Sequence, residues 1–233
     1  MITSKDCYLT GNCYKYKKDG TCQLSDVYCP KLFKMNFLFD EAQLTDKQRL
    51  HTGLYYDEDG TDKDKFQQLK EIETNIEKFV SDGNNLYIHS SITGNGKTLW
   101  AIRMLQSYFG KIWHKTDFEC RGLFINVPRF FLALKDNIAN KSEYVNHIKE
   151  NIEKADIIVW DEVGTKQLTS FEHENLLSYI NLRVDSGKSN IYTSNLSSGE
   201  LRNLVGDRLY SRIANLSVDI ELRGQDKRGL KFE

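Results

Sequence analysis

The sequence predicts an α/β fold, a five-stranded parallel sheet with helices on both faces, together with a small Cys-rich N-terminal module. Three observations lead to this prediction. Short apolar runs alternate with stretches of helical periodicity from residue 66 onward. A glycine turn follows the first of these runs, and several later runs end in polar residues. Strands this apolar are typical of a parallel sheet that is covered on both faces.

The predicted elements follow from periodicity and from residues that mark boundaries. The predicted strands are the apolar runs at 86–90, 123–127 and 155–162, the stretch 190–195, and the stretch 217–223, in which apolar and polar residues alternate. The predicted helices span 66–80, 98–109, the stretch opened by Pro128, 144–152, 169–182, the stretch opened by Ser197, and 207–214. Gly110 is the expected C-cap of the second helix. Thr169 and Glu172 have the spacing of a capping box, and so do Ser197 and Glu200.

Composition narrows the class of protein. The 233 residues suffice for one α/β domain with an appendage, and a hydrophobic share of 39% is that of a globular protein. The net charge of −1 excludes a generally basic surface, so any contact with nucleic acid has to be local. No apolar run is long enough to span a membrane, and the N-terminus lacks the apolar core of a signal peptide. We therefore expect a cytoplasmic protein.

The stretch TGNGKT, residues 93–98, resembles a phosphate-binding loop. The pattern G-x-x-x-x-G-K-[ST] is complete except that Ser91 replaces its first glycine. Loop N–H groups and the following helix N-terminus attract phosphate, Lys97 supplies a cation for it, and the Thr98 hydroxyl is a ligand for Mg²⁺. Gly94 and Gly96 allow close backbone approach. The alternative is a surface turn between a strand and a helix.

Polar residues end two of the later strands, where a ligand of a parallel sheet binds. Asp161 follows an apolar strand and suits the coordination of a Mg²⁺ ion through its waters. Glu162 is placed to orient or deprotonate an attacking water. Asn195 is placed to bind a γ-phosphate or that water. The alternatives are an acidic strand end at 161–162 and a simple turn at 195.

Two arginines, Arg208 and Arg212, are four residues apart and therefore share a helix face. Either one could reach the γ-phosphate in a neighbouring subunit, as an arginine finger acting in trans. The alternative is that both are solvated surface side chains.

Together, TGNGKT, IIVWDEVG, IYTSN and GDRLYSRI resemble, in order and spacing, the AAA+ helicase loaders of the DnaC and DnaI type and the related IstB-like ATPases. The similarity covers residues 66–223. It implies a P-loop AAA+ (ASCE) sheet, ATP and Mg²⁺ as cofactors, and ATP hydrolysis. The residues implied to contact ATP are Thr93, Gly94, Asn95, Gly96, Lys97, Thr98 and Leu99. The residues implied to be catalytic are Lys97, Asp161, Glu162, Asn195 and Arg212, with Arg208 as the second arginine-finger candidate; Thr98 and Asp161 hold Mg²⁺.

The function implied by the resemblance is ATP-dependent loading of a hexameric replicative helicase onto single-stranded DNA, in a protein that self-associates through its ATP site. A phage-encoded protein in the host cytoplasm is one form of this hypothesis. One alternative is an IstB-like transposition helper. Another is a nucleotide-binding adaptor with little turnover, and a small-molecule kinase is a weaker option. The helix through Tyr179 and Arg183 is a candidate DNA contact, and Phe39–Leu44 is a candidate adenine pocket.

The resemblance also implies a division of the chain. Residues 1–40 form a helicase-interacting module, 41–65 a linker and 66–233 the ATPase domain. Thiolates of the four N-terminal cysteines are candidate Zn²⁺ ligands, because so short a segment has little core of its own. These cysteines are Cys7, Cys13, Cys22 and Cys29. Their spacing lacks the usual C-x2–4-C pair, so free thiols are the alternative. Cys120 lies apart and is not expected to bind metal.

Overall fold

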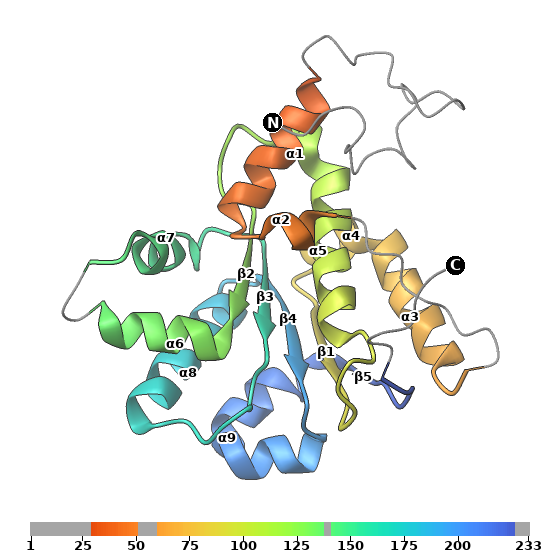
Figure 1. The fold of residues 1–233 in the computed structure, drawn as a ribbon, viewed down its shortest axis with the longest axis vertical. Coiled ribbons are helices and arrows are strands. Elements are labelled where there is room, and N and C mark those ends of the chain that lie inside the picture. The colour runs from red at the N-terminus through yellow and green to blue at the C-terminus, as the bar shows by residue number, and fades with distance from the viewer. Residues whose placement is uncertain (1–28, 51–59, 138–140, 227–233) are drawn as a thin grey trace.

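The computed structural model describes residues 29–50, 60–137 and 141–226. Its sheet consists of β1 (Asn85–His89), β2 (Gly122–Asn126), β3 (Ile157–Asp161), β4 (Ser189–Ser194) and β5 (Ser217–Glu221). The strand order is β2-β3-β4-β1-β5, and every neighbouring pair is parallel (Figure 1). The five predicted strands and the parallel sheet are confirmed.

Helices cover the sheet in two layers (Figure 1). One layer comprises α1 (Pro30–Glu41), α3 (Lys63–Thr74), α4 (Ile76–Ser81) and α5 (Lys97–Ile112). The other comprises α6 (Val127–Asp136), α7 (Glu143–Asn151), α8 (Ser170–Asp185) and α9 (Ser198–Ile213). A short helix α2 (Asp46–Arg49) and a 3₁₀ turn, η3 (Trp113–Lys115), complete the described elements.

Strand β3 shows why the apolar runs are continuous. Ile157 and Val159 face the layer that contains α5, whereas Ile158 and Trp160 face the layer that contains α8. All four are fully buried. Because successive side chains of a strand point to opposite faces, a strand covered on both sides has no position for a polar residue until it ends.

The N-terminal helix α1 packs in the same core as the sheet. Met35, Leu38 and Phe39 are buried with residues of α5, and Phe124 of β2 donates its N–H to the Ala42 carbonyl at 2.8 Å. This packing favours a boundary near residue 29 for any N-terminal module, whereas the sequence-based division places it at residue 40. The division itself stays a prediction, because residues 1–28 lie outside the described part of the chain.

The helix boundaries differ from the predicted ones at three places. The two helices predicted from Ser197 and at 207–214 form one helix, α9, which is kinked at Gly206. Helix α5 continues through Gly110, so the predicted C-cap is wrong. Gly110 lies within the last turns of α5, where a Cβ would meet nothing within 4 Å. The helix therefore continues through this glycine instead of ending at it. The predicted helix 66–80 is divided into α3 and α4 at Asn75. Both predicted capping boxes are present, at Thr169 and at Ser197.

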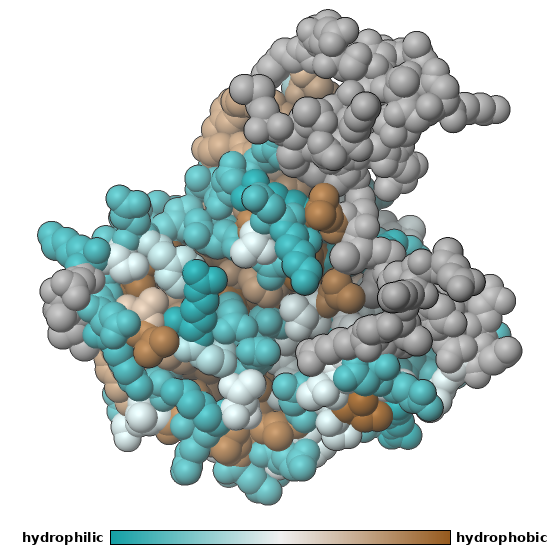
Figure 2. Space-filling model, viewed as in Figure 1, coloured by the Kyte–Doolittle hydropathy of each residue, from teal (hydrophilic) through white to brown (hydrophobic). Residues whose placement is uncertain are grey.

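The outer surface is mainly hydrophilic on the face shown in Figure 2, with hydrophobic residues scattered over it. Among the helices of the described residues, none combines the length and the hydropathy needed to cross a membrane.

Candidate functional site

The glycine loop connects β1 to α5 at the carboxyl end of the sheet. Gly94 has φ +76° and Gly96 has φ +102°, a backbone conformation that favours glycine. Ser91 does not have a positive φ. Among the described residues other than glycine, a positive φ occurs at Gln43, Phe118 and Glu162. Serine is therefore compatible with the backbone at the position where the loop pattern has its first glycine.

Side chains of the loop hold it in shape. The Asn95 amide donates to the Ser90 hydroxyl at 2.6 Å and to the Leu222 carbonyl at 3.2 Å, which ties the loop to the end of β5. The Lys97 ammonium donates to the Ile92 carbonyl at 2.8 Å and to Asn95 Oδ1 at 3.2 Å. Lys97 is 7% exposed, so its ammonium group lies against the loop and not in solvent. Leu99, in the first turn of α5, is exposed.

The loop meets the first acid directly. Thr98 Oγ1 donates to Asp161 Oδ1 at 2.8 Å, which brings the start of α5 to the end of β3. Burial raises the pKa of Asp161; hydrogen bonds from Thr193 and Thr98 oppose this, and the nearby Glu162 carboxylate adds to it. A hydroxyl beside a carboxylate is the kind of oxygen pair that Mg²⁺ prefers. Thr98 and Asp161 therefore fit the predicted magnesium ligands, and a bound cation would favour the ionised form of Asp161.

The second acid has a strained backbone. Glu162 has φ +62°, which is uncommon for a residue with a side chain and recurs at functional sites. Its N–H donates to Thr193 Oγ1 at 3.0 Å, and that hydroxyl donates to Asp161 Oδ1 at 2.7 Å. Thr193 thus fixes both acids at once.

Asn126, at the end of β2, completes this arrangement. Its amide nitrogen lies 3.0 Å from Glu162 Oε2 and 3.4 Å from Asp161 Oδ2. Its amide oxygen accepts the Arg129 N–H at 3.2 Å as the N-cap of α6. Neither Asn126 nor Thr193 is among the site residues predicted from the sequence. In the sequence, Asn126 stands just before a helix with proline in its first turn, which predicts an N-cap. This pattern does not predict the contact of the Asn126 amide with Glu162.

The remaining predicted site residues, Asn195, Arg208 and Arg212, differ in position and in exposure. Asn195 directly follows β4 and is half-buried. Arg208 is exposed and Arg212 is half-buried, both in the part of α9 beyond the kink at Gly206. Their roles stay predictions, because an arginine finger acts on a second subunit.

Arg183 is not a DNA contact. Its side chain is fully buried and donates to main-chain carbonyls, among them Ile152 at 2.6 Å and Ser189 at 2.6 Å. Burial lowers the pKa of Arg183 to about 10. Tyr179 is half-buried and packs against Phe130. The prediction for this helix is therefore wrong for Arg183, whose charge serves to satisfy carbonyls inside the fold.

The predicted adenine pocket at Phe39–Leu44 is also wrong. Phe39 and Leu44 are buried in the core, and the Phe39 ring lies 5.9 Å from that of Phe109. Phe109 is near the far end of α5, whereas the glycine loop precedes its first residue. These side chains are thus occupied in packing, about three turns of helix away from the loop.

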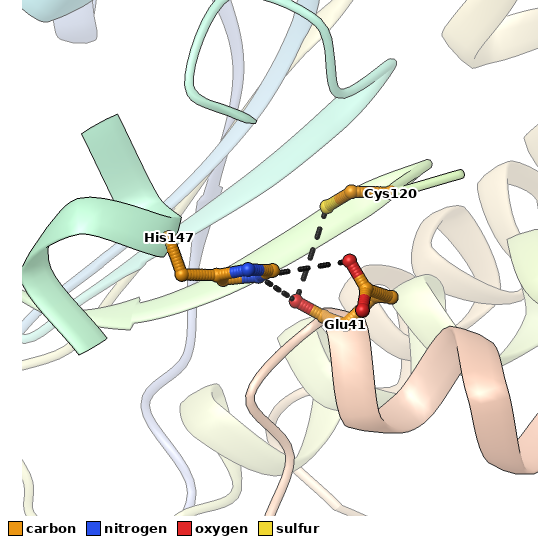
Figure 3. A group of neighbouring side chains, drawn as sticks. All are labelled: Glu41, Cys120 and His147. Carbon is orange, nitrogen blue, oxygen red and sulfur yellow. Dashed lines mark hydrogen bonds and ion pairs between the residues drawn. The ribbon is translucent and has the colours of Figure 1, made fainter. Parts of the chain in front are cut away.

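The described residues contain one further group with metal-ligand chemistry, namely Glu41, Cys120 and His147 (Figure 3). Asn151 donates to the His147 carbonyl at 2.9 Å, so its N–H₂ group also faces His147 Nδ1 at 3.5 Å. Nδ1 then accepts and Nε2 carries the proton, which is donated to the Glu41 main-chain carbonyl at 2.7 Å. Burial, with the Glu41 charge, raises the pKa of Cys120 to about 12. We interpret this group as a hydrogen-bonded cap of α1.

The four-cysteine prediction falls mostly outside the described residues. Cys7, Cys13 and Cys22 lie there, and Cys29 is half-buried immediately before α1. Zinc binding by these cysteines stays a prediction.

Comparisons with known proteins agree with the fold and the loop. The family model described as IstB-like ATP binding protein matches residues 34–216. Among solved structures, the DnaC helicase loader has a TM-score of 0.59 and 18% identity, covering 72% of this chain and 94% of that chain. DnaI has a TM-score of 0.56 and 20% identity, covering 74% and 88%. Domain III of DnaA from Thermotoga maritima has a TM-score of 0.54 and 19% identity, covering 82% and 68%. No curated protein matches the sequence significantly.

Proposed function

The chain belongs to the family of IstB-like ATP-binding proteins, and we propose that it is an ATPase that loads a hexameric replicative helicase onto single-stranded DNA. The observation that carries the proposal is the composite site. A glycine loop, a hydroxyl, two acids and an amide from four separate elements meet at the carboxyl edge of the sheet. Such a site suits water attack on a bound phosphate.

The chain's own residues divide the chemistry among them. The loop N–H groups and Lys97 bind and orient the phosphates. Thr98 and Asp161 would hold Mg²⁺, which would neutralise charge on the phosphates when bound. Glu162 accepts a proton from the attacking water or orients it. The contact between Asn126 and Glu162 keeps that carboxylate beside Asp161, at 3.0 Å from the amide.

Loading of a helicase is supported by the structural neighbours. One of them is described as the DnaC helicase loader, and the present chain covers 94% of it. Another is described as DnaA bound to AMPPCP and single-stranded DNA, which supports a nucleotide-dependent contact with single strands. An assembly that closes around the γ-phosphate through Arg212 and opens after hydrolysis would couple ATP to delivery.

The transposition helper is the second candidate, because the matching family model carries the IstB name. The two functions differ in the partner, a hexameric helicase or a transposase. The cysteines of the N-terminal segment favour the helicase, in line with the module that the resemblance to loaders implies.

A pull-down of the purified protein with the replicative helicase of the same genetic system tests the proposal. We expect ATP-dependent capture of the hexamer at micromolar protein, lost in Lys97→Ala. Capture of the transposase with no capture of the helicase would select the second candidate. Lys111→Ala is a matched control, because Lys111 lies in the last turn of the same helix α5, away from the loop.

The adaptor hypothesis is tested by turnover. We expect DNA-stimulated ATP hydrolysis that disappears in Glu162→Gln while ATP binding is retained. Binding of ATP without measurable hydrolysis in the unmodified protein would favour the adaptor instead.

A further inference from the structure

The segment that follows β5 returns to the glycine loop. Leu222 donates its N–H to the His89 carbonyl at 2.8 Å and accepts from the Asn95 amide at 3.2 Å. The chain therefore leaves the sheet directly alongside the loop rather than pointing into solvent.

A buried carboxylate fixes the next two residues of this segment. Asp62 is 4% exposed and accepts the N–H of Arg223 and the N–H of Gly224, both at 2.7 Å. A Cβ at Gly224 would come 2.7 Å from Asp62 Oδ2, so the approach is close enough to favour glycine. These contacts join residues about 160 positions apart and set the direction of the chain beyond β5.

The chain so directed places Asp226 on the glycine loop. A Cβ built on Gly94 would have all three heavy atoms of the Asp226 carboxyl group within 2.8 Å. Ordinary contacts of a Cβ begin near 3.4 Å, so the carboxyl group occupies space that only a glycine leaves open. Gly94 lies in the middle of the loop that is expected to surround phosphate.

We propose that Asp226 blocks the glycine loop from within the chain, and that nucleotide phosphates must displace its carboxylate in order to bind. The proposal rests on the proposed nucleotide binding at this loop and adds its regulation. A carboxylate and a phosphate are both anions with hydrogen-bond-accepting oxygens, and they repel each other at one position. Occupation of the loop by one therefore excludes the other.

The geometry allows release without loss of the sheet. The last backbone contact with Asp62 is at Gly224, two residues before Asp226. Rotation about residues 224 and 225 would withdraw the carboxylate while β5 keeps its parallel pairing with β1. The apparent association constant then equals the intrinsic constant multiplied by the fraction of molecules in which the loop is open.

Equilibrium binding of a fluorescent, non-hydrolysable ATP analogue with Mg²⁺ tests this device in the full chain. Asp226→Asn removes the charge and Asp226→Ala removes the whole group. If the loop is open in roughly a tenth of the molecules, the alanine variant binds about tenfold more tightly. Glu221→Gln is the matched control, because it removes one negative charge at the end of β5 from a carboxylate that pairs with Arg223.

The rates make the test sharper. Removal of a blocking group raises the association rate constant and leaves the dissociation rate constant nearly unchanged. Equal affinity of wild type, Asp226→Ala and Glu221→Gln would overturn the proposal while leaving nucleotide binding intact. A gain that comes only from slower dissociation would also overturn it, since Asp226 would then lie beside the bound nucleotide. Absence of binding in every variant, Asp226→Ala included, would instead remove the proposed function.

Discussion

At the scale of single residues, Thr193 has an influence that its small side chain does not suggest. One hydroxyl accepts the Glu162 N–H and donates to Asp161, and it is 2% exposed. Both acids of the candidate site therefore depend on a residue from the neighbouring strand. The positive φ of Glu162 makes the first of these contacts more important, because a strained residue keeps its conformation only while its surroundings enforce it.

Thr193→Val removes the hydroxyl and preserves the shape of the side chain. We expect the free energy of unfolding to fall by about 1–3 kcal/mol, because a buried N–H and a carboxylate oxygen each lose a partner. We also expect ATP hydrolysis to fall more than tenfold, measured by phosphate release. Thr193→Ser keeps the hydroxyl and should retain most of the activity. Unchanged hydrolysis in the valine variant would show that the position of Glu162 does not depend on Thr193.

Ser91 stands where the loop pattern has glycine, but its backbone does not require one. We expect Ser91→Gly to change the affinity for ATP by less than about threefold, which is under 1 kcal/mol. Isothermal titration with a non-hydrolysable analogue would measure it. A large loss of affinity would mean that the Ser91 side chain itself contacts the nucleotide.

At the scale of elements, the N-terminus of α8 depends on one carboxylate. Glu172 accepts the Thr169 N–H at 2.9 Å, and the ammonium groups of Lys135 and Lys166 at 2.9 and 3.0 Å. Burial alone would raise the pKa of Glu172, but these hydrogen bonds outweigh it and lower the pKa to about 2. The capping box predicted from sequence therefore also connects α8 to Lys135 of α6 and to Lys166, which lies between β3 and α8.

A lowered pKa has a definite consequence for stability against pH. The stabilisation from ionised Glu172 is fully present above the unfolded pKa, near 4.5, and is lost as the pH falls toward 2. Glu172→Gln should lower the free energy of unfolding by about 1.5–3 kcal/mol at pH 7. In urea unfolding series from pH 7 to pH 3, the difference between wild type and variant should shrink below pH 4.5. A difference independent of pH would contradict this assignment.

At the scale of the whole molecule, the arginine-finger hypothesis requires that two subunits assemble at the ATP site. Arg212 is half-buried in α9, and Arg208 beside it is exposed. If Arg212 completes the site of a neighbouring subunit, Arg212→Ala should retain nucleotide affinity and lose at least about tenfold in hydrolysis. Equilibrium binding of a non-hydrolysable ATP analogue and phosphate release from ATP would measure the two effects. Recovery of activity on mixing Arg212→Ala with Glu162→Gln would confirm action in trans, and Arg202→Ala, an exposed arginine of the same helix, is the control.

Much of this molecule was predictable from the sequence. Strands and helices were found because burial on both faces of a sheet leaves an apolar run of five or six residues, and because caps such as Thr169 are local signals. Lys97 and Thr98 were found through the pattern of the glycine loop, and Asp161 was found because it stands at the end of an apolar run. The failures at Arg183 and Phe39–Leu44 concern burial, which neighbouring positions in the chain do not determine. The failure at Gly110 concerns a helix end, because α5 continues past this glycine to Ile112, which is buried in the core.

The sequence by itself determined the parallel α/β architecture, the glycine loop and the acidic strand end, because each is encoded within a few consecutive residues. The order of the strands decided the rest. With β3 between β2 and β4, Asn126 and Thr193 reach Glu162 from opposite sides. With β5 beside β1, the chain after Leu222 passes the loop, and Asp62 directs Asp226 onto Gly94. Such contacts join residues that are 31 to 162 positions apart, and only the tertiary structure specifies which of them meet.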